Sequence, residues 1–61
     1  MTYSELERLL RKNGCHKVRE GHNHAIWRSP ITGKEFQVGR HGREEVKTGT
    51  LNKILKDAGL K

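Results

Sequence analysis

The chain has 61 residues, a formal net charge of +6 and an apolar content of 31%. We expect one domain over residues 1–61, because a chain this short buries only about 60% of the surface that it exposes when unfolded. Its single cysteine, Cys15, excludes an internal disulfide and a metal cluster held by thiolates alone. The sequence has no apolar run of about 18 residues and no signal-peptide pattern, so we expect a cytoplasmic protein without a membrane partner.

Charge is the strongest signal in the composition. The chain has 13 Lys and Arg residues against 7 Asp and Glu residues, and its isoelectric point is near 10.0. This balance fits a polyanionic partner such as RNA, because each basic side chain that meets a phosphate releases condensed counterions. The alternative is a surface whose charges serve only solubility.

The first predicted element is a helix that begins close to the N-terminus. Its apolar residues follow the i, i+3, i+4 spacing of one helical face: Tyr3, Leu6, Leu9 and Leu10. Thr2 with Glu5, or Ser4 with Glu7, fits a capping box, and the sequence leaves both open. We expect the helix to end at residues 13–14, Asn-Gly, because glycine adopts the left-handed conformation without strain.

Three short segments after this helix have the composition of strands. The segments are residues 15–19, 24–28 and 34–38, separated by turns at residues 20–23 and 29–33. Alternation along the central segment places Trp27 on the face opposite to His24. Trp27 therefore either belongs to the core or offers a base-stacking platform on an open face.

A second helix closes the chain after a polar, basic loop at residues 39–47. We expect it to begin near Thr48, whose hydroxyl would cap the first backbone N–H groups, and to end at Gly59. The order helix, three strands, helix predicts an α+β fold. Short connections favour an antiparallel meander with both helices on one face and the other face open to a partner.

Four histidines in so short a chain raise the question of a metal site. His22 and His24 are two residues apart, so they would point to one side of a strand and form half of such a site. The other candidate ligands are Cys15, His16 and His41, and none has a recognised metal spacing. We therefore expect no metal, and a small metal-binding structural protein remains an alternative.

His24 has the setting of a reactive residue because it opens a strand directly after a glycine-containing turn. Imidazole exchanges protons near neutral pH, and nearby cations favour its neutral, basic form. This arrangement suits RNA cleavage without a metal, in which the base removes a ribose 2′-OH proton and cations stabilise the phosphate charge. The neighbouring cations are Lys17, Arg19, Arg28 and Arg40.

The segment around His24 resembles the histidine segment of the HicA toxins, also called YcfA-like mRNA interferases. Residues 19–27 read Arg-Glu-Gly-His-Asn-His-Ala-Ile-Trp, and the family commonly has glycine, then Ser or Asn, the histidine, and a hydrophobic–aromatic pair. The resemblance covers nearly the whole chain. Further matching stretches are residues 4–6, 9–10, 13–14, 38–41, 45–51 and 54–60. Two departures are Asn23, where many members have serine, and Gly39, where many have proline.

The resemblance implies a double-stranded-RNA-binding-domain-like fold and a toxin that cleaves mRNA. It also implies a HicB-type antitoxin as protein partner and no cofactor. The family's catalytic histidine corresponds to His24, because His24 follows Asn23 and precedes the hydrophobic–aromatic pair. The alternative function is a non-catalytic RNA-binding module of the same fold.

Other residues are candidates for RNA contacts. Asn23 either orients the histidine or a phosphate through its amide, or serves the turn alone. Residues 48–50 resemble a family signature at a helix start, where N–H groups bind phosphate, so Thr48 is a candidate as well as a cap. His41 would protonate the leaving oxygen or be a solvated surface residue, and Lys47 adds charge to the basic loop. We expect Gly21 to serve the turn.

Overall fold

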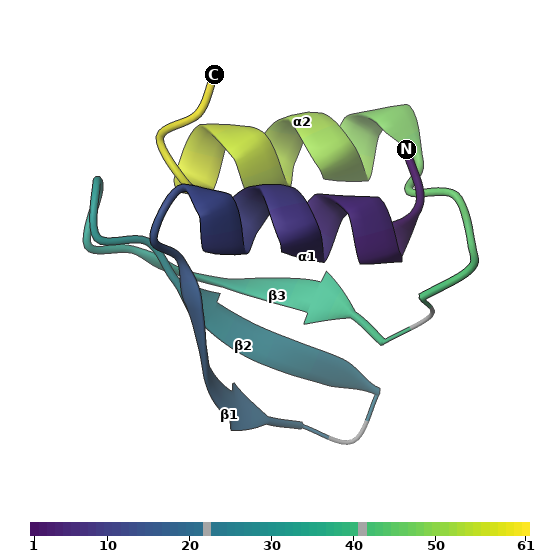
Figure 1. The fold of residues 1–61 in the computed structure, drawn as a ribbon, viewed down its shortest axis with the longest axis horizontal. Helices are drawn as coiled ribbons and strands as arrows, with labels where there is room; N and C mark the ends of the chain where they lie inside the picture. The colour runs from purple at the N-terminus through teal and green to yellow at the C-terminus, as the bar shows by residue number, and fades with distance from the viewer. Residues whose placement is uncertain (22, 41) are drawn as a thin grey trace.

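The computed structural model describes residues 1–21, 23–40 and 42–61 of the chain. Its elements follow the order α-β-β-β-α (Figure 1), which confirms the predicted α+β, double-stranded-RNA-binding-domain-like fold class. The elements are α1 (Tyr3–Lys12), β1 (His16–Glu20), β2 (His24–Arg28), β3 (Glu35–Gly39) and α2 (Thr48–Asp57). No helix in these described ranges is long and apolar enough to cross a membrane.

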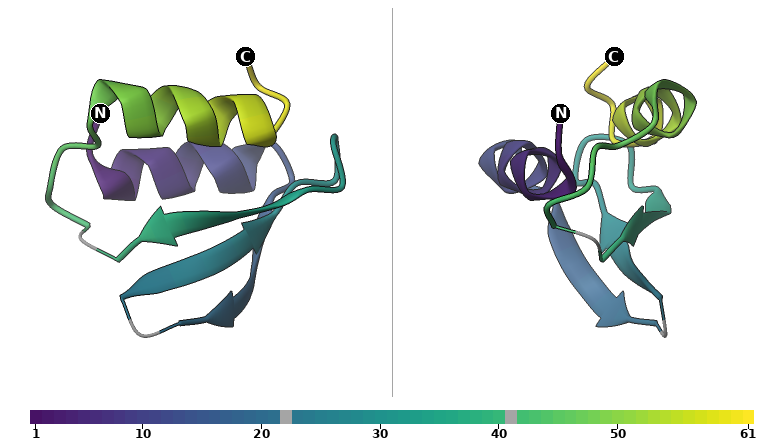
Figure 2. Two further views of the ribbon diagram at one scale, coloured as in Figure 1. Left: turned by 180° about the vertical axis from the view of Figure 1, so that it is seen from behind. Right: turned by 90° about the vertical axis from the view of Figure 1, so that its right-hand side faces the viewer.

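The three strands form one antiparallel sheet in the order β1-β2-β3. Both helices pack on the same side of this sheet, as predicted, and the other side is not covered by the described chain (Figures 1 and 2). Lys17 lies opposite Trp27 and Arg19 opposite Ile26, so one extra residue bulges out of β1 between them. β3 is an edge strand, and it is the strand that packs against α2.

The predicted segment 24–28 matches β2, but β1 and β3 each begin and end one residue later than predicted. Cys15 is not a strand residue because its backbone N–H donates to the carbonyl of Leu10 and so completes the end of α1. Lys34 belongs to the hairpin turn, where its carbonyl accepts a hydrogen bond from the backbone N–H of Ser29. Hydrogen bonds at the helix end and in the hairpin turn therefore place Cys15 and Lys34 outside the strands to which the sequence assigned them.

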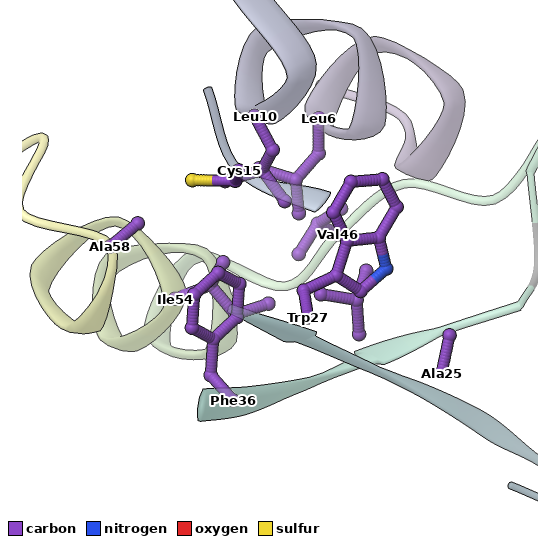
Figure 3. Packing of buried hydrophobic residues seen from close by; sticks show 10 residues of the cluster. Leu6, Leu10, Cys15, Ala25, Trp27, Phe36, Val46, Ile54 and Ala58 are labelled. Carbon is purple, nitrogen blue, oxygen red and sulfur yellow. The ribbon is translucent and has the colours of Figure 1, made fainter. Parts of the chain in front are cut away.

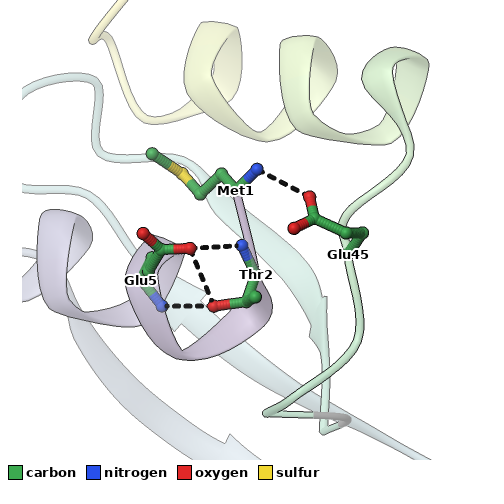
Figure 4. A network of polar contacts seen from close by, with 4 residues as sticks. All are labelled: Met1, Thr2, Glu5 and Glu45. Carbon is green, nitrogen blue, oxygen red and sulfur yellow. Dashed lines mark hydrogen bonds and ion pairs between the residues drawn. The ribbon is translucent and has the colours of Figure 1, made fainter.

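A capping box formed by Thr2 and Glu5 begins α1 and settles the choice that the sequence left open (Figure 4). The Thr2 hydroxyl accepts a hydrogen bond from the Glu5 backbone at 3.3 Å, and the Thr2 backbone donates to the Glu5 carboxylate at 2.9 Å. The Thr2 hydroxyl also donates to this carboxylate at 3.1 Å, and the two bonds from the Thr2 backbone and hydroxyl lower the pKa of Glu5. The Met1 amino group lies 2.7 Å from the Glu45 carboxylate, which ties the loop before α2 to the start of α1.

The core fills the space between the sheet and the two helices (Figure 3). Trp27 is its largest fully buried side chain, at 1% exposure. Its ring faces the helices, so it is a core residue and not a stacking platform on the open face. The guanidinium of Arg11 lies 5.2 Å from the ring centroid and the Lys17 ammonium 6.0 Å. The buried hydrophobic residues are Leu6, Leu10, Cys15, Ala25, Trp27, Phe36, Val38, Val46, Ile54 and Ala58.

The start of α2 differs from the prediction in its cap. The helix begins at Thr48 as expected, but Lys47 occupies the N-cap position and makes no side-chain cap hydrogen bond. The prediction that the Thr48 hydroxyl caps the helix is wrong because the capping residue must have extended dihedral angles. Lys47 has them, at φ −60° and ψ 142°, and Thr48 is already the first helical residue.

Hydroxyl groups from the β2–β3 turn bind the other end of α2. The Ser29 hydroxyl is buried and donates to the Ala58 carbonyl at 2.7 Å, while it accepts a hydrogen bond from the Ile31 backbone at 3.1 Å. The Thr32 hydroxyl donates to the Asp57 carbonyl at 2.7 Å. These bonds satisfy carbonyl groups that a helix end leaves without partners, and they attach α2 to the hairpin.

We expect the substitution Ser29→Ala to lower the free energy of unfolding by about 1–3 kcal/mol, because it leaves buried backbone groups without partners. Urea unfolding measures the change. Ser4→Ala is the matched control, since Ser4 is an exposed helical residue and alanine is the better helix former. An equal effect of the two substitutions would contradict the role given to Ser29.

Candidate functional site

The turn before β2 fixes the backbone at His24. The Gly21 backbone N–H donates to the His24 carbonyl at 2.7 Å. A Cβ atom at Gly21 would lie 2.8 Å from the same carbonyl oxygen, closer than side chains approach backbone in folded proteins. Glycine is therefore required here by close approach, which confirms the turn role predicted for Gly21. His22 lies outside the described residues.

His24 is exposed and is the first residue of β2. Ala25 and Trp27, its neighbours in the alternating pattern, are buried under the helices, so the His24 side chain leaves the sheet on the uncovered side. Its partner across the sheet is Gly39, at the end of β3. The imidazole thus lies beside a residue without a side chain, at the end of an edge strand.

A groove opens beside His24 and runs between β3 and α2. Its volume is about 490 Å³. It is lined by Tyr3, His24, Glu35, Phe36, Gln37, Gly39, Thr50, Lys53, Ile54 and Asp57. This groove was not predicted from the sequence. Thr50 belongs to the signature at residues 48–50, but the sequence does not show that the face of α2 that carries Thr50 and Lys53 lies beside β3.

The Tyr3 ring closes the groove at the His24 end. A Cβ atom at Gly39 would lie 3.2 Å from two ring carbons of Tyr3 and 3.3 Å from its hydroxyl oxygen. The ring therefore occupies the space of a residue-39 side chain, which gives a physical reason for glycine at this position. Because Gly39 pairs with His24, the first turn of α1 is brought next to the histidine.

Arg40 and Asn23 lie at the same end of the molecule as His24. Asn23 is exposed in the turn before β2. The Arg40 guanidinium donates to the Gly21 carbonyl at 3.5 Å and lies 3.8 Å from the Glu20 carboxylate, so it binds the outside of the turn. Arg19 pairs with Ile26, which places it on the same sheet face as His24.

Two other predicted RNA-binding residues occupy different parts of the sheet. Arg28 is at the opposite end of β2, about 13 Å along the strand from His24 at 3.3 Å per residue. Lys17 lies beside the Trp27 ring, on the side of the helices. The structure therefore does not bring all the predicted cations together around the histidine.

The start of α2 carries two more of these candidates, Lys47 and Thr48, which are exposed. Figure 1 shows this start on the same side of the molecule as the beginning of β2 and the end of β3, but in the layer of the helices. His41 lies outside the described residues.

Glu20 joins two of the cations. The Lys17 ammonium donates to its carboxylate at 3.2 Å, and Arg40 approaches the same oxygen. The hydrogen bond from Lys17 and then the charge of Arg40 lower the pKa of Glu20. The Glu20 carboxylate thereby keeps the side chains of Lys17 and Arg40 close to the turn between β1 and β2.

Metal ligands do not gather in the described part of the chain. No group of three His, Cys, Asp or Glu side chains is placed to hold a metal ion among residues 1–21, 23–40 and 42–61. The pair formed by His22 and His24, considered as half of a metal site, falls partly outside these ranges. The chemistry available at His24 from the described residues is proton transfer and electrostatic binding.

We expect Gly21→Ala to displace the His24 carbonyl and to lower the free energy of unfolding by about 1–3 kcal/mol, the usual cost of forcing atoms into a filled space. Chemical unfolding and the amide NMR shifts of residues 23–25 measure these effects. Gly49→Ala is the control, because nothing lies within 4 Å of its Cβ position. The Gly49→Ala control should raise the free energy of unfolding by about 0.5–1 kcal/mol, because alanine is more favourable than glycine inside a helix. Unchanged shifts at His24 in the Gly21 variant would contradict the close approach.

We expect the pKa of Glu20 to lie below its ordinary value of 4.5 and to rise toward that value in Lys17→Gln. Because folding lowers this pKa, the stabilisation is present above the unfolded-state pKa and is lost as the pH falls through the folded-state pKa. The difference in unfolding free energy between wild type and Glu20→Gln should thus be present at neutral pH and vanish in acid. NMR titration of the carboxyl carbon gives the pKa, with Lys34→Gln as the control. An equal pKa in both lysine variants would contradict the assignment.

Comparison with known proteins agrees with this architecture. The pattern of the family described as HicA toxin of bacterial toxin-antitoxin matches residues 3–60. No curated protein and no solved structure matches the chain significantly. Because the family match spans nearly all of the 61 residues, the chain belongs to the HicA toxin family of bacterial toxin–antitoxin systems.

Proposed function

We propose that this toxin is a metal-independent endoribonuclease that cleaves mRNA, with His24 as its acid–base residue. The observation that carries the proposal is the position of His24: it is exposed, its backbone is fixed by the Gly21 hydrogen bond, and it borders a groove. A rigid but accessible imidazole is what proton transfer to and from a bound substrate requires.

The proposed reaction is transesterification within the RNA chain. The His24 imidazole removes the proton from a ribose 2′-OH, and the resulting oxygen attacks the adjacent phosphorus. The bond from phosphorus to the 5′-oxygen of the next nucleotide breaks, which leaves a 2′,3′-cyclic phosphate. The leaving oxygen takes up a proton from an imidazolium, and we assign this step to His24 or to His41.

Cations near His24 would stabilise the charge that grows on the phosphate oxygens. Arg40 is one predicted candidate, because it contacts the turn that precedes His24 and its guanidinium has five N–H donors. Arg19 shares the sheet face of His24, and Asn23 is adjacent to it in sequence. We propose that these three residues contact the RNA close to the cleaved bond.

The remaining candidates would bind the RNA backbone farther along the strand. Arg28 lies at the other end of β2 from His24, Lys17 lies on β1 beside the Trp27 ring, and Lys47 and Thr48 lie at the start of α2. Backbone N–H groups at a helix start bind phosphate, and no side chain caps this one. Each such contact adds affinity that falls as the salt concentration rises.

The protein partner of this toxin is an antitoxin, as the family implies. We propose that it is of the HicB type and covers His24 with the surrounding basic surface, using acidic or apolar groups. The core is small, with ten buried hydrophobic residues in the described part of the chain, so such binding would also raise the apparent stability by mass action.

We expect His24→Ala to reduce RNA cleavage by at least 100-fold, the usual contribution of a general acid–base residue, and to abolish toxicity in a growth assay. His16→Ala is the matched control, because His16 is also exposed but pairs with Arg28 at the other end of the sheet. It should retain cleavage. Full cleavage by a folded His24→Ala variant would reject the assignment, and salt-sensitive RNA binding by a wild type that never cleaves would favour the non-catalytic RNA-binding module.

A further inference from the structure

We propose that the groove between β3 and α2 binds one nucleotide of single-stranded RNA next to the cleaved phosphate, and that Glu35 and Asp57 read its base. This inference rests on the endoribonuclease function proposed above and adds a specificity site to it. The groove begins at His24 and is continuous with the reactive end of the molecule.

The size of the groove fits a small ligand. Its volume of about 490 Å³ falls within the range of about 300–1,000 Å³ that is typical of ligand sites. Along α2 its wall extends from Thr50 to Asp57, which is about 10 Å at the rise of a helix. Phe36 and Ile54, which are almost fully buried in the core, form the apolar floor between the two walls.

Charge along the groove fixes the orientation of the nucleotide. Lys53 is on the α2 wall, one turn beyond Thr50, and would attract a phosphate. Glu35 and Asp57 are at the opposite end from His24 and would repel one. No ion pair among the described residues neutralises any of these three side chains. The phosphate therefore belongs near His24 and Lys53, and the base belongs at the acidic end.

At the acidic end, the carboxylates of Glu35 and Asp57 would select a base by the N–H groups that the base presents to them. A carboxylate only accepts hydrogen bonds, so it favours the amino groups of guanine, adenine and cytosine. Guanine is the best match, because its N1–H and N2–H groups lie side by side and meet both oxygens of one carboxylate. Uracil is the poorest match, since its Watson–Crick edge has one N–H between two carbonyl oxygens that a carboxylate repels.

Sequencing of cleavage products from a random, unstructured RNA pool tests the base preference. At one of the two positions next to the cut, we expect guanine to be enriched and uracil depleted in wild-type products. Glu35→Gln or Asp57→Asn should reduce this preference by about 10-fold, as expected for the loss of a bidentate base contact. Glu44→Gln removes the same charge outside the groove and should keep the wild-type preference.

Binding by the inactive His24→Ala variant tests the phosphate contact. Lys53→Ala in this background should weaken binding equally for all bases and lower the slope of log affinity against log salt by about 1. Lys56→Ala removes the same charge from an exposed residue of α2 outside the groove and serves as the comparison. Equal slopes for the two lysine variants would overturn the assignment of Lys53.

The outcomes separate this inference from the proposed function. If wild type cleaves RNA and both carboxylate variants keep its base preference, the groove inference is wrong and the endoribonuclease function stands. If wild type does not cleave, the function fails, and NMR titration of the groove still decides the inference. Guanosine 5′-monophosphate should shift the amide signals of Gln37 and Thr50 more than uridine 5′-monophosphate does. Equal shifts, or shifts induced only by an antitoxin, would overturn the inference.

Discussion

The burial of Trp27 is the constraint on which the rest of the structure depends. Its ring fills the space between the sheet and the helices at 1% exposure, and both helices of the described ranges lie on this face of the sheet. The alternating pattern of β2 then sends His24 to the uncovered side. One buried aromatic residue thus determines which side chains of β2 face the uncovered side of the sheet. A small core and an exposed His24 are two results of the same packing.

Close contacts at one end of the molecule position the residues around His24. Gly21 permits the hydrogen bond that fixes the His24 backbone, and Gly39 makes room for the Tyr3 ring beside it. Glu20 holds Lys17 and Arg40 by charge at the same turn. These contacts involve α1, β1, the turn before β2 and the end of β3, and they lie around the start of β2.

Periodicity predicted the elements well because helices, strands and glycine stops are local features, and the 24–28 segment matches β2. The Thr48 cap was wrong because the sequence does not show that Lys47 takes the extended dihedral angles. The groove was missed because Lys53 and Glu35 line a common groove only when α2 packs on the β3 edge. The distance of Arg28 from His24 and the position of Lys17 on the helix side of the sheet likewise depend on strand register, and a β1 bulge is not visible in composition.

The central claim is that His24 activates a ribose 2′-OH without a metal. The most direct measurement is the chemistry of the RNA ends left by the purified wild-type toxin in the presence of a chelator. The account predicts a 2′,3′-cyclic phosphate on one product and a free 5′-hydroxyl on the other. Products that end in a 3′-hydroxyl and a 5′-phosphate, or cleavage that stops when the chelator is added, would contradict it.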